Sequence, residues 1–529
     1  MRVTFILSWL LLALTVHGAT PEVGKAALRK LVKLPTITFQ ANWSFDPERG
    51  FTLGSVEQDA ATQITALRKE LKHTPNDAES FQRLGELYSA INDAPNAQKA
   101  WHRSVDLYRQ RVDLQPDDAI LLAGFGQALH GAGKSQEAES VLRKAVQLAP
   151  TEWKCLLALG RVLDAEARHD IYGDSETITD PATHFAQPAS GNVSLAQRRL
   201  CEADAYFDQA IAAAPDEAAV YFRRGLHCCL RDLLLGQIRV AEGESKAEVY
   251  RANNYFSPAA LGDLQHASRL SPQNYALIGN TLLFEIYTVT APQGEINWPE
   301  FSRNSLPDKS QRSVHEAVTR LENLAQNPDP RLASGALEVL GIVQGPILHE
   351  PRSCLTHLRR ALALDASREQ AWEVLLATLA QAGRYDEMLA ACQERLKQND
   401  SARTRLLLAK ALEKFKQWDA AENEILAALK QAPNSFTANL ARAALLLKRS
   451  HDPALLGEAN GWLARAEHLL GEIPAPQRTQ QQIFDFTLTR GIYFALTDEV
   501  VTARQWVQTV ISQDKNNKLA HDILSAMDY

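Results

Sequence analysis

Few stretches of this sequence hold residue types that could do chemistry, and the most suggestive of them is glycine-rich. The run GAGKS at 131–135 has the composition of a phosphate-binding loop, in which backbone N–H groups and a lysine hold phosphate oxygens. That motif also needs a glycine five positions before Gly133, where Ala128 stands, and a strand ahead of it. The residues ahead of it have a helical pattern instead. We therefore interpret Gly133 and Lys134 as a turn between two helices.

Metal-dependent and histidine-based catalysis are disfavoured as well. His349 and Glu350 begin like a zinc-protease helix, but Pro351 breaks the helix and no second histidine follows at the required spacing. Four more histidines stand alone on predicted helices, where a surface group or a hydrogen-bonded core group is commoner than a ligand or a base: His227, His266, His315 and His357. The sequence has no G-x-S-x-G motif and no recurrent pair of acids. We predict no enzyme activity, no cofactor and no metal.

The six cysteines show no C-x2-C spacing, which disfavours a structural zinc site. Most of them stand where the helical pattern asks for a small apolar residue, so core packing is one interpretation. A second hypothesis concerns Cys201, which lies early in one predicted helix, while Cys228 and Cys229 lie late in the next. Adjacent antiparallel helices would meet there, so the hypothesis is a disulfide from Cys201 to Cys228 or Cys229 in an oxidising compartment.

Composition and charge exclude some partners. Of the 529 residues, 45% are hydrophobic and 22% are charged, and the formal net charge is −7. The charges are spread without long runs of one sign, which argues against a protein that binds nucleic acid through phosphate attraction. The frequent Ala, Leu, Gln, Glu and Arg favour helices, so the predicted class is all-α.

The first eighteen residues, MRVTFILSWLLLALTVHG, have the pattern of a secretory signal peptide. Arg2 precedes an apolar run that is short for a membrane span, which needs about 20 apolar residues, and an uncleaved anchor is the alternative. We expect cleavage after Gly18, and so an exported protein, periplasmic or extracellular, with no membrane span after cleavage. No cysteine lies near that point, so a lipid anchor is not supported.

A helical pattern repeats along most of the chain after residue 57, and its most regular copy occupies residues 119–150. Its apolar and small residues lie on one stripe of each of two helices: Leu122, Phe125, Gly126 and Leu129, then Ala138, Leu142 and Ala145 before Pro150. Gly126 and Ala138 are expected where the two helices approach closely. This spacing resembles the tetratricopeptide repeat (TPR), a helix–turn–helix of about 34 residues.

The resemblance implies an all-α fold, a right-handed α-α superhelix of about ten helix–turn–helix repeats with loop insertions. Residues 57–330 form a predicted array in which three successive repeats carry long insertions in the same connection. Such insertions emerge on one edge of a stack, so we expect them to cluster. Residues 331–529 form a more regular array that ends in a capping helix.

Residues 19–56 do not fit the repeat and form a predicted N-terminal arm. Within it, KAALRKLVK at 25–33 is a short basic amphipathic stretch, and ITFQANWSF at 37–45 alternates apolar and polar residues, which predicts a strand. Three interpretations remain for this arm. It is flexible, it folds as a cap along the first repeats, or its strand pairs with another protein, which would make the chain an assembly factor.

TPR superhelices generally bind a peptide or a segment of another protein in a concave groove that the first helices line, so the resemblance implies a protein-interaction scaffold. The groove-facing candidates are Gln82, Glu86, Gln127, Arg161, Phe222, Arg223, Leu226, Glu373, Arg403 and Lys410. Arg161 and Arg223 come first among them because arginine holds a carboxylate in a bidentate manner. TPR domains that clamp a chaperone's C-terminal carboxylate use Lys and Asn where Gln82 and Glu86 stand, which argues against that partner class.

One alternative function places a small-ligand or catalytic pocket in the clustered insertions. Aromatic side chains that could line it are Tyr250, Tyr255, Phe256, Trp298 and Phe301.

Overall fold

The computed structural model describes residues 21–35, 44–46, 50–52, 56–90, 93–172, 192–241, 243, 258–290, 303–449, 453–473, 478 and 480–528. Three predictions lie wholly or mostly outside these residues: the signal peptide, the aromatic residues of the insertions, and most of the strand at 37–45.

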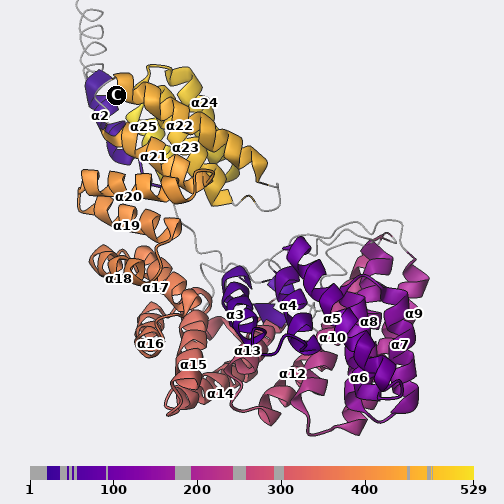
Figure 1. Cartoon of the computed structure of the whole chain (residues 1–529). Helices are drawn as coiled ribbons and strands as arrows, with labels where there is room; N and C mark the ends of the chain where they lie inside the picture. The colour runs from indigo at the N-terminus through magenta and orange to yellow at the C-terminus, as the bar shows by residue number, and fades with distance from the viewer. Residues whose placement is uncertain are drawn as a thin grey trace, which may run out of the picture. The chain divides into compact units, whose positions relative to one another are not determined.

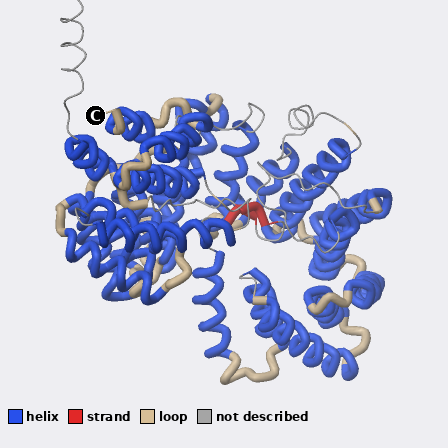
Figure 2. Tube along the Cα trace, turned by 90° about the horizontal axis from the view of Figure 1, so that it is seen from above, coloured by secondary structure: helices blue, strands red, loops and turns tan. Residues whose placement is uncertain are grey.

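The fold is all-α, a solenoid of TPR-type helix pairs, with one short β-hairpin among the described residues (Figures 1 and 2). Helix α3 (Val56–Glu70) precedes the first pair, and α25 (Lys518–Ala526) follows the last. In chain order, the described residues form ten pairs: α4 (Ala78–Ala90) with α5 (Ala94–Leu114), α6 (Ala119–Gly131) with α7 (Ser135–Leu148), α8 (Trp153–Tyr172) with α9 (Val193–Ala213), α10 (Ala218–Ala241) with α12 (Pro258–Leu270), α13 (Tyr275–Thr290) with α14 (Asp308–Leu324), α15 (Pro330–Ile342) with α16 (Pro351–Leu364), α17 (Glu369–Gln381) with α18 (Tyr385–Gln398), α19 (Ala402–Lys414) with α20 (Trp418–Gln431), α21 (Phe436–Arg449) with α22 (Pro453–Glu472), and α23 (Gln480–Leu496) with α24 (Val500–Gln513).

One contact recurs in these pairs and explains the repeated glycine. A Cβ added to Gly160 of α8 would lie 2.9 Å from the ring of Phe207 on α9, and one added to Gly491 of α23 would lie 2.9 Å from Val507 on α24. The same first-helix glycine faces a large second-helix side chain in other repeats: Gly85 with Trp101, Gly126 with Leu142, Gly225 with Leu264, and Gly341 with Leu358. The close approach predicted at Gly126 is confirmed.

The turns between paired helices also share a conformation. The residue two positions before the second helix has a positive φ in five repeats: Gly133, His349, Gly383, Lys416 and Asp498. Glycine adopts this left-handed region without a steric penalty, which accounts for its presence at two of the five positions. The GAGKS run is therefore the turn between α6 and α7, as predicted. Its Gly133 and Lys134 N–H groups donate to carbonyls of α6 rather than pointing at a ligand.

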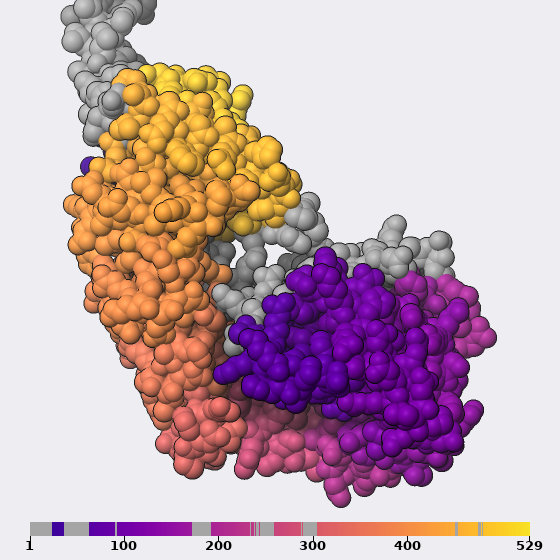
Figure 3. Space-filling view, viewed as in Figure 1, coloured from indigo at the N-terminus to yellow at the C-terminus, as the bar shows by residue number. Residues whose placement is uncertain are grey.

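The chain folds as two compact units, one of residues 40–375 and one of residues 1–39 with 376–529. In Figure 3 the yellow atoms belong to the second unit. Both described ends of the chain thus belong to the same unit. The predicted change in repeat regularity at residue 330 stays a prediction.

Helix α2 (Pro21–Leu31) is the described part of the N-terminal arm. It packs against α21, α23 and α25, beside which it lies in indigo in Figure 1. The expectation that the arm folds along the first repeats is therefore wrong for α2. Its amphipathic pattern predicts a buried face but carries no information on which repeats cover that face.

The hairpin, red in Figure 2, consists of β1 (Ser44–Asp46) and β2 (Gly50–Thr52). They pair antiparallel, with Phe45 opposite Phe51, and β2 lies against α13. The described end of the predicted strand thus finds its partner strand six residues further along the same chain.

Candidate functional site

A pocket lies between the first helices of repeats three and four, and it contains both arginines that the sequence favoured. Its lining residues are Arg161, Asp164, Ala165 and Arg168 from α8, Phe207 from α9, and Arg223 and Leu230 from α10. The cavity volume is about 30 Å³, room for a water or the tip of a side chain rather than for a small organic ligand.

The repeat register explains how α8 presents its polar residues to this pocket. Gly160 faces the second helix of its pair, and the next residue along a helix is turned by about 100°. Arg161 therefore points away from the pair, and Asp164 and Arg168 follow three and seven positions later on the same face. Arg223 reaches the pocket from the first helix of the next repeat, where its guanidinium also lies 6.0 Å from the Phe222 ring centroid.

A buried histidine joins the three helices that build the pocket. His227 of α10 has a side chain that is 0% exposed. Its Nδ1 lies 2.6 Å from Oδ1 of Asp164 on α8, and its Nε2 lies 2.9 Å from Oδ1 of Asp204 on α9. Its ring centroid lies 4.9 Å from that of Phe207, a pocket residue. Asp164, which lines the pocket, is therefore held by a histidine on α10 that also binds Asp204 on α9.

The two carboxylates keep this histidine charged. Burial opposes the charge, but Asp164 and Asp204 outweigh it and raise the pKa of His227 to about 9. Burial likewise opposes the charge of Asp204, yet His227 and Arg231 lower the pKa of that carboxyl. Because both ring nitrogens of His227 donate to carboxylates at neutral pH, neither is available as a base or as a metal ligand. His227 is thus a hydrogen-bonded core group, the commoner of the predicted roles.

The other candidates do not line the pocket, although Phe222 and Leu226 share α10 with Arg223. Gln82 of α4 donates from Nε2 to Oε1 of Gln127 on α6, at 2.9 Å. Phe222 packs partly buried against a hydrophobic core cluster. Leu226 is 1% exposed within that cluster, so its assignment to the groove is wrong.

Three further candidates follow later in the chain. Glu373 lies half-buried on α17, in the unit of residues 40–375. Arg403 is exposed at the start of α19, and Lys410 is half-buried further along that helix, both in the other unit. Of the seven principal groove candidates, the pocket therefore contains Arg161 and Arg223.

The sequence did not single out Asp164, Arg168, Phe207 or Asp204. A signal for two of them was present, because Asp164 and Arg168 share the helical face of Arg161. The pairing of His227 with Asp164 and Asp204 had no local signal, since the three residues stand on three helices and His227 is separated from Asp164 by 63 positions.

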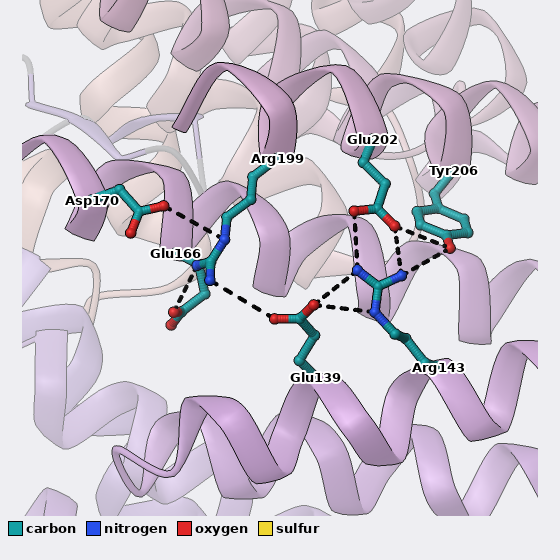
Figure 4. A network of polar contacts seen from close by, with 7 residues as sticks. All are labelled: Glu139, Arg143, Glu166, Asp170, Arg199, Glu202 and Tyr206. Carbon is teal, nitrogen blue, oxygen red and sulfur yellow. Dashed lines mark hydrogen bonds and ion pairs between the residues drawn. The ribbon is translucent and has the colours of Figure 1, made fainter. Parts of the chain in front are cut away.

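An ion-pair network on α7, α8 and α9 holds repeats two and three together (Figure 4). The guanidinium of Arg143 donates to both carboxylate oxygens of Glu202, at 2.5 and 3.0 Å, and to Glu139 at 2.8 Å. Arg199 pairs with Glu166 at 2.8 Å. The hydrogen bond from Arg143 lowers the pKa of Glu202. The bidentate pair of Arg143 with Glu202 joins α7 to α9, and the pair of Arg199 with Glu166 joins α9 to α8, the helix that carries Arg161.

All six cysteines are free thiols, so the disulfide hypothesis is wrong in this structure. Cys201 is exposed on α9, whereas Cys228 and Cys229 are buried on α10. Burial raises the pKa of Cys228 to about 12 and that of Cys229 well above its usual value. The two buried thiols thus pack as small apolar side chains, which was the first interpretation of the cysteines.

No helix among the described residues is long and apolar enough to cross a membrane. No protein-family model matches the chain, and no curated protein matches it.

Solved structures of other proteins are similar to this chain at low identity. Yeast Tom70 is 12% identical, with a TM-score of 0.33, over 89% of this chain and 95% of its own. A chain of the APC/C hetero-tetramer Cut9–Hcn1 is 12% identical, with a TM-score of 0.34, over 89% and 88%. YrrB, a TPR protein with an unusual peptide-binding site, is 18% identical, with a TM-score of 0.27, over 39% and 95%. These likenesses are distant, and the fold assignment rests on the chain's own helix pairs.

Proposed function

We propose that this chain is a non-catalytic scaffold that binds an acidic segment of another protein on the first-helix face of repeats three and four. The observation that carries this proposal is the pocket, where Arg161 and Arg168 of α8 lie with Arg223 of α10. Arginine guanidinium groups bind carboxylates with paired, charge-assisted hydrogen bonds. Phe207, which is 1% exposed, closes the bottom of the pocket and belongs to the hydrophobic core.

The groups beneath the pocket support this role. His227 carries its charge at neutral pH and holds Asp164, so the one acidic side chain of the lining already has a cationic partner. The Arg143–Glu202 network fixes the neighbouring helices. A site whose supporting side chains are held in place loses less conformational entropy when a ligand binds. We also propose, on the pattern of residues 1–18, that the protein acts after export.

A labelled hexaglutamate peptide tests the proposal by fluorescence anisotropy on the full chain. We expect saturable binding at low salt that weakens as salt screens the charges. The Arg161→Gln, Arg223→Gln double variant should bind at least about tenfold more weakly, since it loses two charged hydrogen-bond donors. The matched control is Arg198→Gln with Arg312→Gln, which removes the same charge from exposed positions on α9 and α14.

The control should bind hexaglutamate as the unmodified chain does. Equal weakening in both double variants would mean that net charge alone drives binding, and it would overturn the assignment to this pocket. Absence of binding by the unmodified chain at low salt would refute the proposed chemistry.

A further inference from the structure

The N-terminal helix α2 contacts α23, where the residue after the repeat glycine is apolar, whereas repeats one to three have Glu86, Gln127 and Arg161 at that position. Ile492 follows Gly491 on α23 as Arg161 follows Gly160 on α8, so the two side chains hold equivalent positions in their repeats. Leu488 and Ala495 lie on the same face of α23, one turn before and one turn after. All three are buried, and Ile492 is 2% exposed. Helix α2 is in contact with α23, and it brings its own apolar residues to the site.

Those residues lie on one side of α2 and of the segment that follows it. Leu28 is 3% exposed, and Val32 and Leu34 are buried as well. An isolated helix of this length is only marginally stable in water, so its order in the structure depends on burying this apolar face.

Lys448 binds the C-terminal end of α2. Nζ of Lys448 on α21 donates to the carbonyl oxygen of Val32 at 2.9 Å, directly after the last residue of α2. The same ammonium pairs with Glu413 of α19 at 2.5 Å. The last carbonyls of a helix lack partners within the helix and carry its negative dipole end, so a cation there satisfies and stabilises it.

Opposite charges on α2 and on the C-terminal repeats also favour the observed placement of this helix. Helix α2 and the residues after it are basic, with Lys25, Arg29, Lys30 and Lys33. Lys25 pairs with Asp498 at 2.8 Å, an exposed contact that sets orientation more than affinity. Lys410 on α19 is an exception to this complementarity: burial lowers its pKa, the like charge of Lys33 lowers it further, and Asp485 and Glu413 raise it. The groove candidate Lys410 thus lies where α2 ends.

We propose that the first-helix face of repeats nine and ten is a second binding site, which takes a short basic amphipathic helix, and that α2 is its resident ligand. This site differs from the arginine pocket in its helices, its charge preference and its ligand conformation. Because α2 reaches it from the opposite end of the sequence, the helix is a tethered ligand whose high effective concentration excludes competitors. Once the binding of the chain's own α2 is weakened, the site accepts the same segment from a separate molecule.

A fluorescent peptide of residues 21–35 tests this on the full chain. The Leu28→Glu, Val32→Glu variant, whose own α2 is weakened, should bind the peptide saturably. The unmodified chain should bind it at least about tenfold more weakly, since the tethered helix competes. Adding Ile492→Glu to the variant should abolish binding, and a peptide with the same two glutamates should bind neither protein. Equal binding by the unmodified chain and the variant, or no binding by a folded variant, would overturn the proposal.

A second measurement avoids any change to α2 or to its groove. A protease site replaces residues 37–43, and the chain is cut there after purification. The N-terminal fragment should remain associated in gel filtration and should be exchanged for labelled peptide added in excess. A fragment that leaves while the peptide fails to bind would contradict the proposal, whether or not the glutamate variant folds.

Discussion

The His227→Gln variant should lose about 3 kcal/mol of unfolding free energy at pH 7, the cost of removing one partner of a buried ion pair. Glutamine cannot carry the charge that Asp164 and Asp204 share through the imidazolium, at 2.6 and 2.9 Å. Both carboxylates then stay partly buried without that cation. Urea unfolding followed by circular dichroism measures the change. His315→Gln, at an exposed position on α14, is the matched control and should change stability by less than about 0.5 kcal/mol.

The pH dependence of the same contact has a definite sign. The pKa of His227 is about 9 in the folded chain and 6.5 without the fold, so the folded state holds the proton more tightly. The stabilisation is complete below pH 6.5 and is lost as pH rises through 9. We expect the unmodified chain to lose about 3 kcal/mol of stability between these values, and the variant to lack that slope. A slope that is the same in both proteins would show that His227 is not its source.

The second large effect concerns the contact between paired helices. Gly126→Val should cost about 3 kcal/mol, because a side chain there overlaps Leu142, which is fully buried. Gly461→Val makes the same chemical change on α22, where nothing lies within 4 Å of an added Cβ. That control should leave stability unchanged or raise it slightly, since valine has a better helix propensity than glycine.

A compensating substitution separates steric overlap from other causes. Leu142→Ala alone leaves a cavity in the core, and it should lower the free energy of unfolding by about 2–5 kcal/mol. The double variant, Gly126→Val with Leu142→Ala, should recover part of the lost stability, because the added valine fills space that the leucine side chain leaves. Urea unfolding of all four proteins gives the coupling energy. Strictly additive losses would refute the proposed contact.

The fold could be predicted from the sequence because the contacts that define it join residues within one repeat. Gly126 and Ala138 are small where two helices meet, and Pro150 ends the second helix, so residues spaced within one repeat already report its packing. The docking of α2 could not be predicted, because an amphipathic pattern predicts a buried face without naming the surface that covers it.

The candidate site was predicted only in part. The register put Arg161 and Arg223 on the groove side, and both line the pocket. It also put Leu226 there, although that side chain is buried in the core. His227 stood alone on its helix in the sequence, and its charge depends on Asp164 and Asp204 of two other helices. Long-range electrostatic pairing of this kind leaves no periodic signal along the chain.

Hydrogen exchange of the full chain with and without hexaglutamate tests the central claim most directly, because it locates the bound peptide without any substitution. We predict slower exchange in peptides from α8 and α10, around Arg161 and Arg223, and unchanged exchange in α21 and α23. Protection that falls outside α8 and α10, or exchange that does not change at saturating peptide, would contradict an acidic-segment site on repeats three and four.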